Sequence, residues 1–173
     1  MGFISQFYPD EYVESTFAID YEKLYKEGYR GIIYDIDNTL VGHGKPADKR
    51  ARDHFKRLKD MGFLVCLLSN NKEPRVASFA KEVGNVYYIY DAHKPSIKAY
   101  LEACEKMGVL RGQTVFIGDQ IFTDVWGAKR AGIRNILVKP LYKKEEIQII
   151  LKRRLEWIVL HFYKKNQQIT KSC

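Results

Sequence analysis

The sequence predicts an α/β fold, a doubly wound parallel sheet with helices on both of its faces. Short apolar runs alternate along the chain with amphipathic segments of helical periodicity. The runs are apolar throughout instead of at every second position, which is typical of strands covered on both faces. Glycine follows most of the amphipathic segments, as it commonly does where a helix ends.

The N-terminal segment, residues 1–28, is expected to be an arm and a helix that pack on the core. Residues 1–20 mix aromatic and acidic side chains around Pro9, which indicates an arm with at least one helical turn. Residues 20–28 predict a short helix, because Asp20 is a common capping residue.

Two strand–helix units follow, each with an apolar run, a polar loop and an amphipathic segment that ends before a glycine. The first loop contains Gly42, Gly44 and Pro46, which favour turns. Strands are expected at residues 29–35 and 63–68, and helices at residues 47–61 and 74–83.

Three more apolar runs complete the predicted sheet, and helical segments follow two of them. Strands are expected at residues 86–90, 113–117 and 133–138, and helices at residues 95–107 and 123–131. The core therefore spans residues 29–140, and residues 141–173 form a separate C-terminal segment.

Composition indicates one ordinary globular domain. The chain has 173 residues, 46% hydrophobic and 29% charged, which is enough to bury a core without disulfides. Cys66, Cys104 and Cys173 are widely spaced, and Cys66 lies inside an apolar run, so a buried thiol in a reducing cytoplasmic setting is expected. We expect neither a secretory signal nor a transmembrane span, because no apolar stretch is long enough.

Polar side chains follow four of the predicted strands where each strand ends. Asp35, Ser69 and Asp119 come directly after the first, second and fourth strands of the core. Lys94 follows the third. Because functional groups of such sheets lie beyond the carboxyl ends of the strands, all four are predicted to converge.

The hexapeptide Asp35-Ile36-Asp37-Asn38-Thr39-Leu40 is the strongest local signal. Two carboxylates at the end of a buried strand are costly to desolvate unless cations lie nearby. A solvated turn would explain a single aspartate here, but it does not explain the other polar groups that follow in order.

Four motifs, taken together and in order, resemble those of the haloacid dehalogenase (HAD) superfamily of hydrolases. The resemblance covers residues 29–138 and implies a Rossmann-like core. The motifs are Asp35-x-Asp37-x-Thr39, Ser69, Lys94 and Gly118-Asp119-x-x-x-x-Asp124.

The resemblance implies a magnesium-dependent phosphatase. Asp35 would attack phosphorus and form an aspartyl-phosphate, and Asp37 would serve as general acid and base. Asp35, the backbone carbonyl of Asp37, and Asp119 would hold Mg²⁺, although Mn²⁺ takes the same oxygen ligands. Asp124 would complete the metal shell or orient Lys94; its alternative is to cap a helix.

The phosphoryl oxygens would be bound by the Ser69 hydroxyl and the Asn70 backbone amide. Lys94 would offset the negative charge of the nucleophile and the phosphate. Without the other motifs, residues 69–71 would be interpreted as an ordinary turn. His43 and His93 flank the predicted site and are more typical of surface or substrate-rim residues than of catalysts.

The spacing of the motifs leaves no room for a cap domain. The interval from Asp37 to Ser69 fits a loop and one helix before the second strand, and the interval from Ser69 to Lys94 fits a helix and a short strand. An open site suits a phosphoryl group carried by a protein, a nucleic acid or a membrane lipid. A small metabolite is also compatible if a second subunit supplies a lid.

The basic C-terminal segment carries +5 of the formal net charge of +8, which suits anionic partners or simply aids solubility. Residues 145–163 are helix-compatible, and core packing and contact with an anionic membrane are both consistent with them. An apolar stripe at helical spacing is expected to pack on the sheet, and Trp157, Val159, Leu160 and Tyr163 widen the apolar surface. The stripe comprises Ile147, Ile150, Leu151, Leu155, Ile158 and Phe162.

Within the superfamily, residues 7–10, residues 35–41 and the capless layout resemble the YqeG type of capless subclass III, which is similar to phosphatidylglycerophosphate phosphatases. This lipid is therefore the favoured substrate, and the enzyme would sit peripherally at the inner face of the membrane. One alternative is a soluble sugar phosphate or nucleotide as substrate. The other is a basic RNA- or ribosome-associated module with a vestigial site, although no RNA-binding signature is present.

Overall fold

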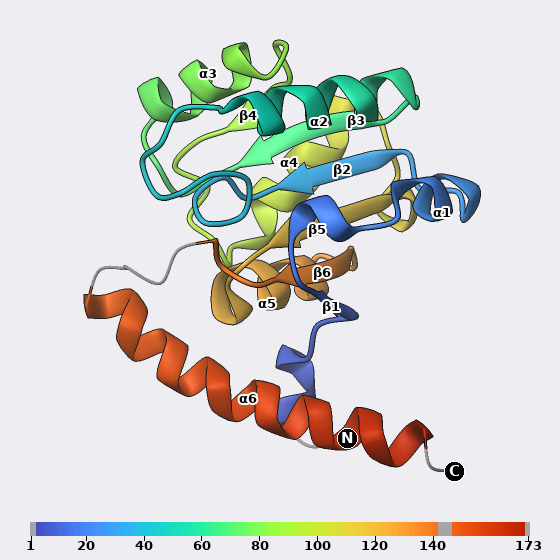
Figure 1. The fold of residues 1–173 in the computed structure, drawn as a ribbon, viewed down its shortest axis with the longest axis vertical. Coiled ribbons are helices and arrows are strands. Elements are labelled where there is room, and N and C mark those ends of the chain that lie inside the picture. Colours follow the sequence, from blue (N-terminus) through green and yellow to red (C-terminus); the bar gives the residue numbers. More distant parts are fainter. Residues whose placement is uncertain (1–2, 142–146, 172–173) are drawn as a thin grey trace.

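A sheet of six parallel strands forms the centre of the protein in a computed structural model, which describes residues 3–141 and 147–171 (Figure 1). The strand order is β1-β6-β5-β2-β3-β4. The strands are β1 (Glu11–Val13), β2 (Gly31–Tyr34), β3 (Leu64–Leu68), β4 (Tyr87–Ile89), β5 (Thr114–Gly118) and β6 (Arg134–Val138).

Helices cover both faces of the sheet, which confirms the predicted doubly wound fold. In β2, Ile32 and Tyr34 point to one face and Ile33 to the other, and all three are buried. The first face packs against α1 (Tyr21–Lys26), α2 (Lys49–Asp60) and α3 (Glu73–Glu82), and the second against α4 (Ile97–Met107) and α5 (Trp126–Arg130).

All five predicted strands and all five helices predicted before residue 132 are present, with ends that differ by one to a few residues. In the described chain, only a loop, α2 and β3 separate Asp37 from Ser69, and only α3 and β4 separate Ser69 from Lys94. Neither interval contains a cap domain, as expected. Cys66 and Cys104 are buried and free, so the predicted buried thiol at Cys66 is confirmed.

The N-terminal arm contains a strand that the sequence did not predict. It has two 3₁₀ turns, η1 (Phe3–Phe7) and η2 (Thr16–Ala18), and between them β1 pairs with β6. The Asp10 carboxylate accepts hydrogen bonds from the backbone (3.0 Å) and side-chain (2.8 Å) amides of Asn135. This polar pair fixes β1 at the edge of the sheet.

The C-terminal helix α6 (Ile147–Lys171) packs with a different face from the one predicted. Leu155, Ile158 and Phe162, which belong to the expected stripe, are exposed. The face turned inward holds Glu156 and Val159, both buried. The first half of the stripe (147, 150 and 151) lies outside the side chains that the structure describes, as do residues 142–146.

The physical reason for this correction is that α6 packs on the arm, on the turn beyond β5 and on the β1–β6 edge of the sheet, and not across the middle of a sheet face. Val159 and Leu160 pack in a small apolar cluster with Ile121 and Leu137. The centroids of the Tyr163 and Tyr8 rings lie 5.6 Å apart. Outside this contact, Leu155, Trp157, Ile158 and Phe162 of α6 are exposed. None of the described helices has the length and apolar character needed to cross a membrane.

Candidate active site

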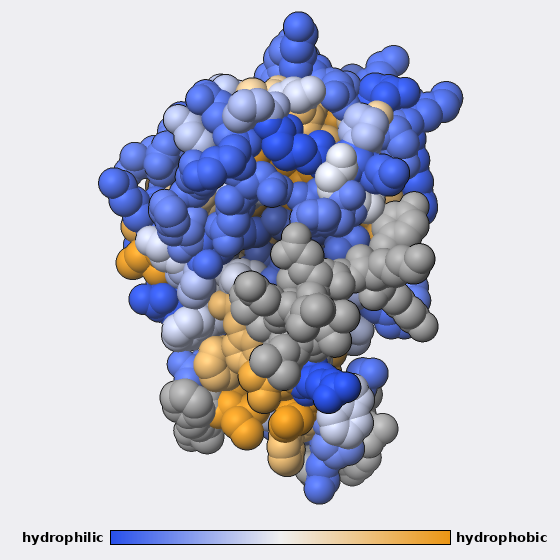
Figure 2. All heavy atoms as spheres, turned by 90° about the vertical axis from the view of Figure 1, so that its left-hand side faces the viewer, coloured by the Kyte–Doolittle hydropathy of each residue, from blue (hydrophilic) through white to orange (hydrophobic). Residues whose placement is uncertain are grey.

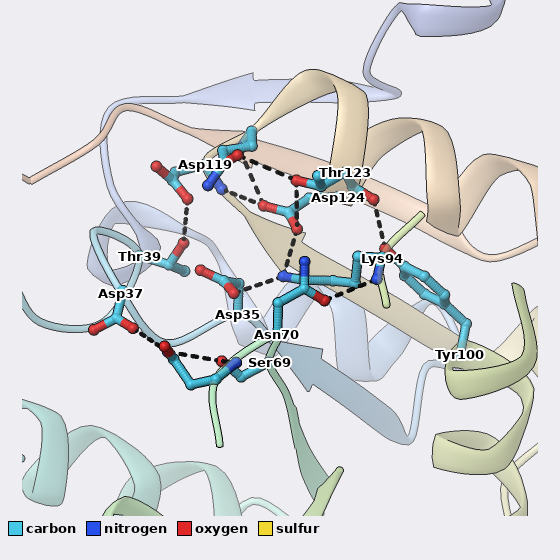
Figure 3. A network of polar contacts seen from close by, with 12 residues as sticks. Asp35, Asp37, Thr39, Ser69, Asn70, Lys94, Tyr100, Asp119, Thr123 and Asp124 are labelled. Carbon is cyan, nitrogen blue, oxygen red and sulfur yellow. Dashed lines mark hydrogen bonds and ion pairs between the residues drawn. The ribbon is translucent and has the colours of Figure 1, made fainter. Parts of the chain in front are cut away.

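The carboxyl ends of β2, β3 and β5 bring the predicted polar residues together (Figure 3). Asp35 follows β2, Ser69 follows β3 and Asp119 follows β5. Lys94 enters from the loop after β4, and its ammonium group lies 2.6 Å from Asp35 Oδ1. All four side chains are buried at the carboxyl edge of the sheet.

Three carboxylates crowd the centre of the site. Oxygen atoms of Asp35, Asp119 and Asp124 lie within 4.8 Å of one another, and all three residues are buried. Burial raises the pKa of Asp35 to about 7; Lys94 opposes this shift, and the neighbouring Asp124 adds to it. A buried set of oxygen donors with excess negative charge suits a hard divalent cation such as Mg²⁺.

Among the described residues, Lys94 is the cation that pairs with two of these carboxylates. Its Nζ contacts Asp124 Oδ1 at 2.7 Å as well as Asp35. Burial alone would lower the pKa of Lys94, but the two carboxylates outweigh it and raise the pKa above its ordinary value. The lysine therefore stays charged at neutral pH.

Asp124 organises the loop that carries Asp119. It sits in η4 (Ile121–Val125), a π-helical turn, and its Oδ2 accepts the backbone N–H groups of Asp119 (3.1 Å) and Gln120 (3.0 Å). A side chain on Gly118 would collide with the Asp124 carboxylate, so only glycine fits there. Asp124 therefore links Lys94 to this loop, and it also belongs to the group of carboxylates that could hold a metal ion.

The turn after β2 places Asp37 beside the cluster. Asn38 takes a left-handed conformation (φ 63°), which asparagine tolerates, and its N–H donates to Val41 O at 2.7 Å. Thr39 is buried and donates its hydroxyl to Asp119 Oδ1 at 3.3 Å. The Asp37 carboxylate instead accepts hydrogen bonds from Asn71 and Arg75.

Residues 69–71 make more hydrogen bonds within the site than the sequence predicted. The buried Ser69 Oγ accepts from the backbone (3.2 Å) and side-chain (3.1 Å) amides of Asn71. The sequence predicts a role for the Asn70 backbone amide only, but the Asn70 side-chain oxygen also accepts a hydrogen bond from the Lys94 backbone N–H at 2.8 Å and so helps to position the lysine. His43 and His93 are both exposed at the rim.

Sequence reasoning missed three residues at the site. Asn71 adjoins a predicted motif and could have been considered, whereas Arg75 in the first turn of α3 carries no motif. Glu156 is buried on α6 and accepts the Ile121 N–H at 2.7 Å, next to the loop of Asp119. Only the fold brings residues 35 positions apart into this contact.

Comparison with known proteins agrees with this geometry. Residues 45–132 match the family model of haloacid dehalogenase-like hydrolases. The Bacillus subtilis (strain 168) protein named Probable phosphatase YqeG is 38% identical over 164 residues, which cover 94% of this chain and 95% of that protein. Phosphatidylglycerophosphate phosphatase 1, chloroplastic/mitochondrial, of Arabidopsis thaliana is 28% identical over 88% of this chain and 47% of its own length.

A solved structure shares the fold. A Thermotoga maritima protein proposed to be a β-phosphoglucomutase superposes with a TM-score of 0.53 and 13% identity, over 71% of this chain and 91% of that one. An identity this low supports only a similar fold. The similarity to the YqeG protein, by contrast, extends along nearly the whole sequence. The chain therefore belongs to the haloacid dehalogenase-like hydrolases and is a phosphatase of that superfamily.

Proposed function

We propose that the protein is a magnesium-dependent phosphomonoester hydrolase that acts through an aspartyl-phosphate on Asp35, with phosphatidylglycerophosphate as its favoured substrate. The observation that carries the proposal is the buried cluster of Asp35, Asp119 and Asp124, in which Lys94 pairs with Asp35 and Asp124.

In the first step an Asp35 carboxylate oxygen attacks phosphorus as the ester P–O bond breaks, and Asp37 donates a proton to the departing oxygen. Lys94 fixes Asp35 Oδ1, which leaves Oδ2 as the attacking atom. In the second step water attacks the phosphoryl group, Asp37 takes the proton of that water, and phosphate leaves the regenerated Asp35.

Four groups would bind the phosphoryl group and its charge. The Ser69 hydroxyl and the Asn70 backbone amide donate hydrogen bonds to its oxygens, and Lys94 offsets its negative charge. Mg²⁺ would be held by Asp35, Asp119 and the backbone carbonyl of Asp37, and when bound it offsets charge on the transferring group. Asp124 keeps Lys94 in place.

The choice of a lipid substrate rests on the open site and on α6. Among the described residues no cap covers the site, so a phosphoryl group at a membrane surface can reach it. Figure 2, which faces the carboxyl edge of the sheet, shows hydrophobic side chains gathered on the lower part of this face, where α6 runs in Figure 1. The similarity to a phosphatase named for this lipid points the same way.

The exposed surface of α6 has the composition of an interfacial helix. Leu155, Trp157, Ile158 and Phe162 are exposed, and Trp157 has 68% of its surface accessible. Arg154, Lys164 and Lys165 are exposed on the same helix. We infer that this surface, called here the α6 patch, makes peripheral contact with anionic lipid and sets the open site against the membrane.

The proposal is tested by phosphate release from phosphatidylglycerophosphate in mixed micelles, with and without Mg²⁺. The variants are Asp35→Asn and, as a matched control, Asp53→Asn on the exposed side of α2. We expect metal-dependent release that Asp35→Asn abolishes and Asp53→Asn preserves. Release of phosphate from an aryl phosphate but not from the lipid would remove the lipid from the proposal. Full activity of Asp35→Asn would overturn the mechanism.

A further inference from the structure

Three donors hold the Asp37 carboxylate from both sides. Oδ1 accepts the Gly44 backbone N–H at 2.8 Å and an N–H of the Arg75 guanidinium at 3.1 Å. Oδ2 accepts the side-chain amide of Asn71 at 2.5 Å. Because both oxygens are held, the carboxylate can neither turn about its own axis nor swing away without breaking a hydrogen bond.

The two side-chain donors are themselves fixed. The Arg75 guanidinium lies over the ring of the buried Phe79, 5.3 Å from its centroid, and the Arg75 side chain is only 22% exposed. Asn71 donates to Ser69 Oγ through both its backbone and side-chain amides. The network therefore links Ser69, proposed to bind the phosphoryl group, with Asp37, proposed to transfer the proton.

We propose that Arg75 and Asn71 are positioning residues that aim the Asp37 carboxylate at the leaving oxygen. The inference rests on the acid–base role proposed above for Asp37. Proton transfer requires the carboxyl group to lie within hydrogen-bond reach of that oxygen. A displacement of about 1 Å can cost roughly 100-fold in rate.

The inference has a consequence that depends on the leaving group. Benzyl phosphate releases a strongly basic alkoxide, which must be protonated as it departs, so its cleavage needs a well-aimed Asp37. 4-Nitrophenyl phosphate releases a stable phenolate that leaves without a proton. Loss of the positioning residues should therefore slow the cleavage of benzyl phosphate and change the cleavage of 4-nitrophenyl phosphate little.

The experiment compares kcat/KM on these two phosphate esters for wild type, Arg75→Ala, Asn71→Ala and Asp37→Asn. Because kcat/KM covers the steps up to phosphorylation of Asp35, later hydrolysis does not mask the difference. Lys72→Ala is the matched control, because Lys72 lies in the same loop but pairs with Asp91 instead. Thermal melting of each variant checks that it is folded.

For Arg75→Ala and Asn71→Ala we expect a 10- to 100-fold loss on benzyl phosphate and a loss below about threefold on 4-nitrophenyl phosphate. Arg75→Lys should recover part of the loss, and Lys72→Ala should match wild type. Equal losses on both esters, a rise in KM alone, or no loss would overturn the inference. If Asp37→Asn loses equal activity on the two esters, the proposed acid–base role of Asp37 fails, and the inference fails with it. If Asp37→Asn loses more activity on benzyl phosphate but Arg75→Ala and Asn71→Ala do not, only the inference fails.

Discussion

Lys94 shows how a single residue holds the site together. Its ammonium group lies between Asp35 and Asp124, and the side chain is 4% exposed. Removing one partner of a buried ion pair leaves uncompensated charge, which typically costs about 3–5 kcal/mol. Asp35 is also one of the groups proposed to hold Mg²⁺, so the loss should depend on Mg²⁺.

We therefore expect Lys94→Met to lower the free energy of unfolding by about 3 kcal/mol without Mg²⁺ and to recover part of that loss when Mg²⁺ is added. Urea unfolding with and without the metal measures this. Lys98→Met on the exposed side of α4 is the control and should change little. A loss at Lys94 that Mg²⁺ leaves unchanged would contradict the expectation.

At the same scale, the central residues of the site could be predicted from the sequence, because functional groups of parallel sheets lie beyond the carboxyl ends of the strands. Asp35, Ser69 and Asp119 each follow an apolar run, so their convergence follows from the parallel sheet itself. Arg75 could not be found this way, because its contact with Asp37 depends on how α3 is seated. An arginine in the first turn of a helix has no pattern that separates it from a solvated one.

At the scale of elements, continuous apolar runs were enough to predict β2 through β6, but β1 has only three residues, all half-buried. Its position comes from Asp10 bonding to Asn135, a contact across 125 residues. The prediction of which face of α6 packs was wrong for a related reason. Periodicity counts apolar side chains, whereas the buried face also includes the Glu156 carboxylate, which accepts a backbone N–H beyond β5.

The packing of α2 on β2 makes stability depend on pH. His54 of α2 is buried, its Nε2 lies 2.9 Å from the Tyr34 hydroxyl, and burial lowers its pKa from 6.5 to about 4. Between these two values the unfolded chain binds a proton that the folded chain excludes. His54 therefore costs no stability above pH 6.5, and its penalty grows as the pH falls from 6.5 to about 4.

Replacing His54 by glutamine, which can still bond to Tyr34 but does not titrate, should flatten the decline in the free energy of unfolding from pH 6.5 to 4. The wild-type minus variant difference, measured by urea unfolding across this range, isolates the histidine from Asp35 and other groups. Exposed His43→Gln serves as the control. Parallel curves for wild type and His54→Gln would contradict the argument.

At the scale of the whole molecule, α6 begins on the side that the carboxyl ends of the strands face (Figure 1), and hydrophobic side chains gather on the lower part of that side (Figure 2). If the patch docks on lipid, the position of the positive charge matters more than its total. Each basic residue near an anionic bilayer contributes about 1 kcal/mol. Lys164→Gln combined with Lys165→Gln should therefore weaken binding to vesicles containing phosphatidylglycerol roughly 30-fold at low salt.

The matched control removes the same two charges elsewhere: Lys56→Gln with Lys59→Gln, both exposed on α2. Co-sedimentation with the vesicles should separate the two double variants, while both keep wild-type turnover of 4-nitrophenyl phosphate. Equal weakening by the two pairs would mean that net charge alone attracts the protein to lipid and that α6 does not orient it. Wild type that stays unbound at low salt would remove membrane contact from the proposal and favour the alternative substrate, a soluble phosphate ester.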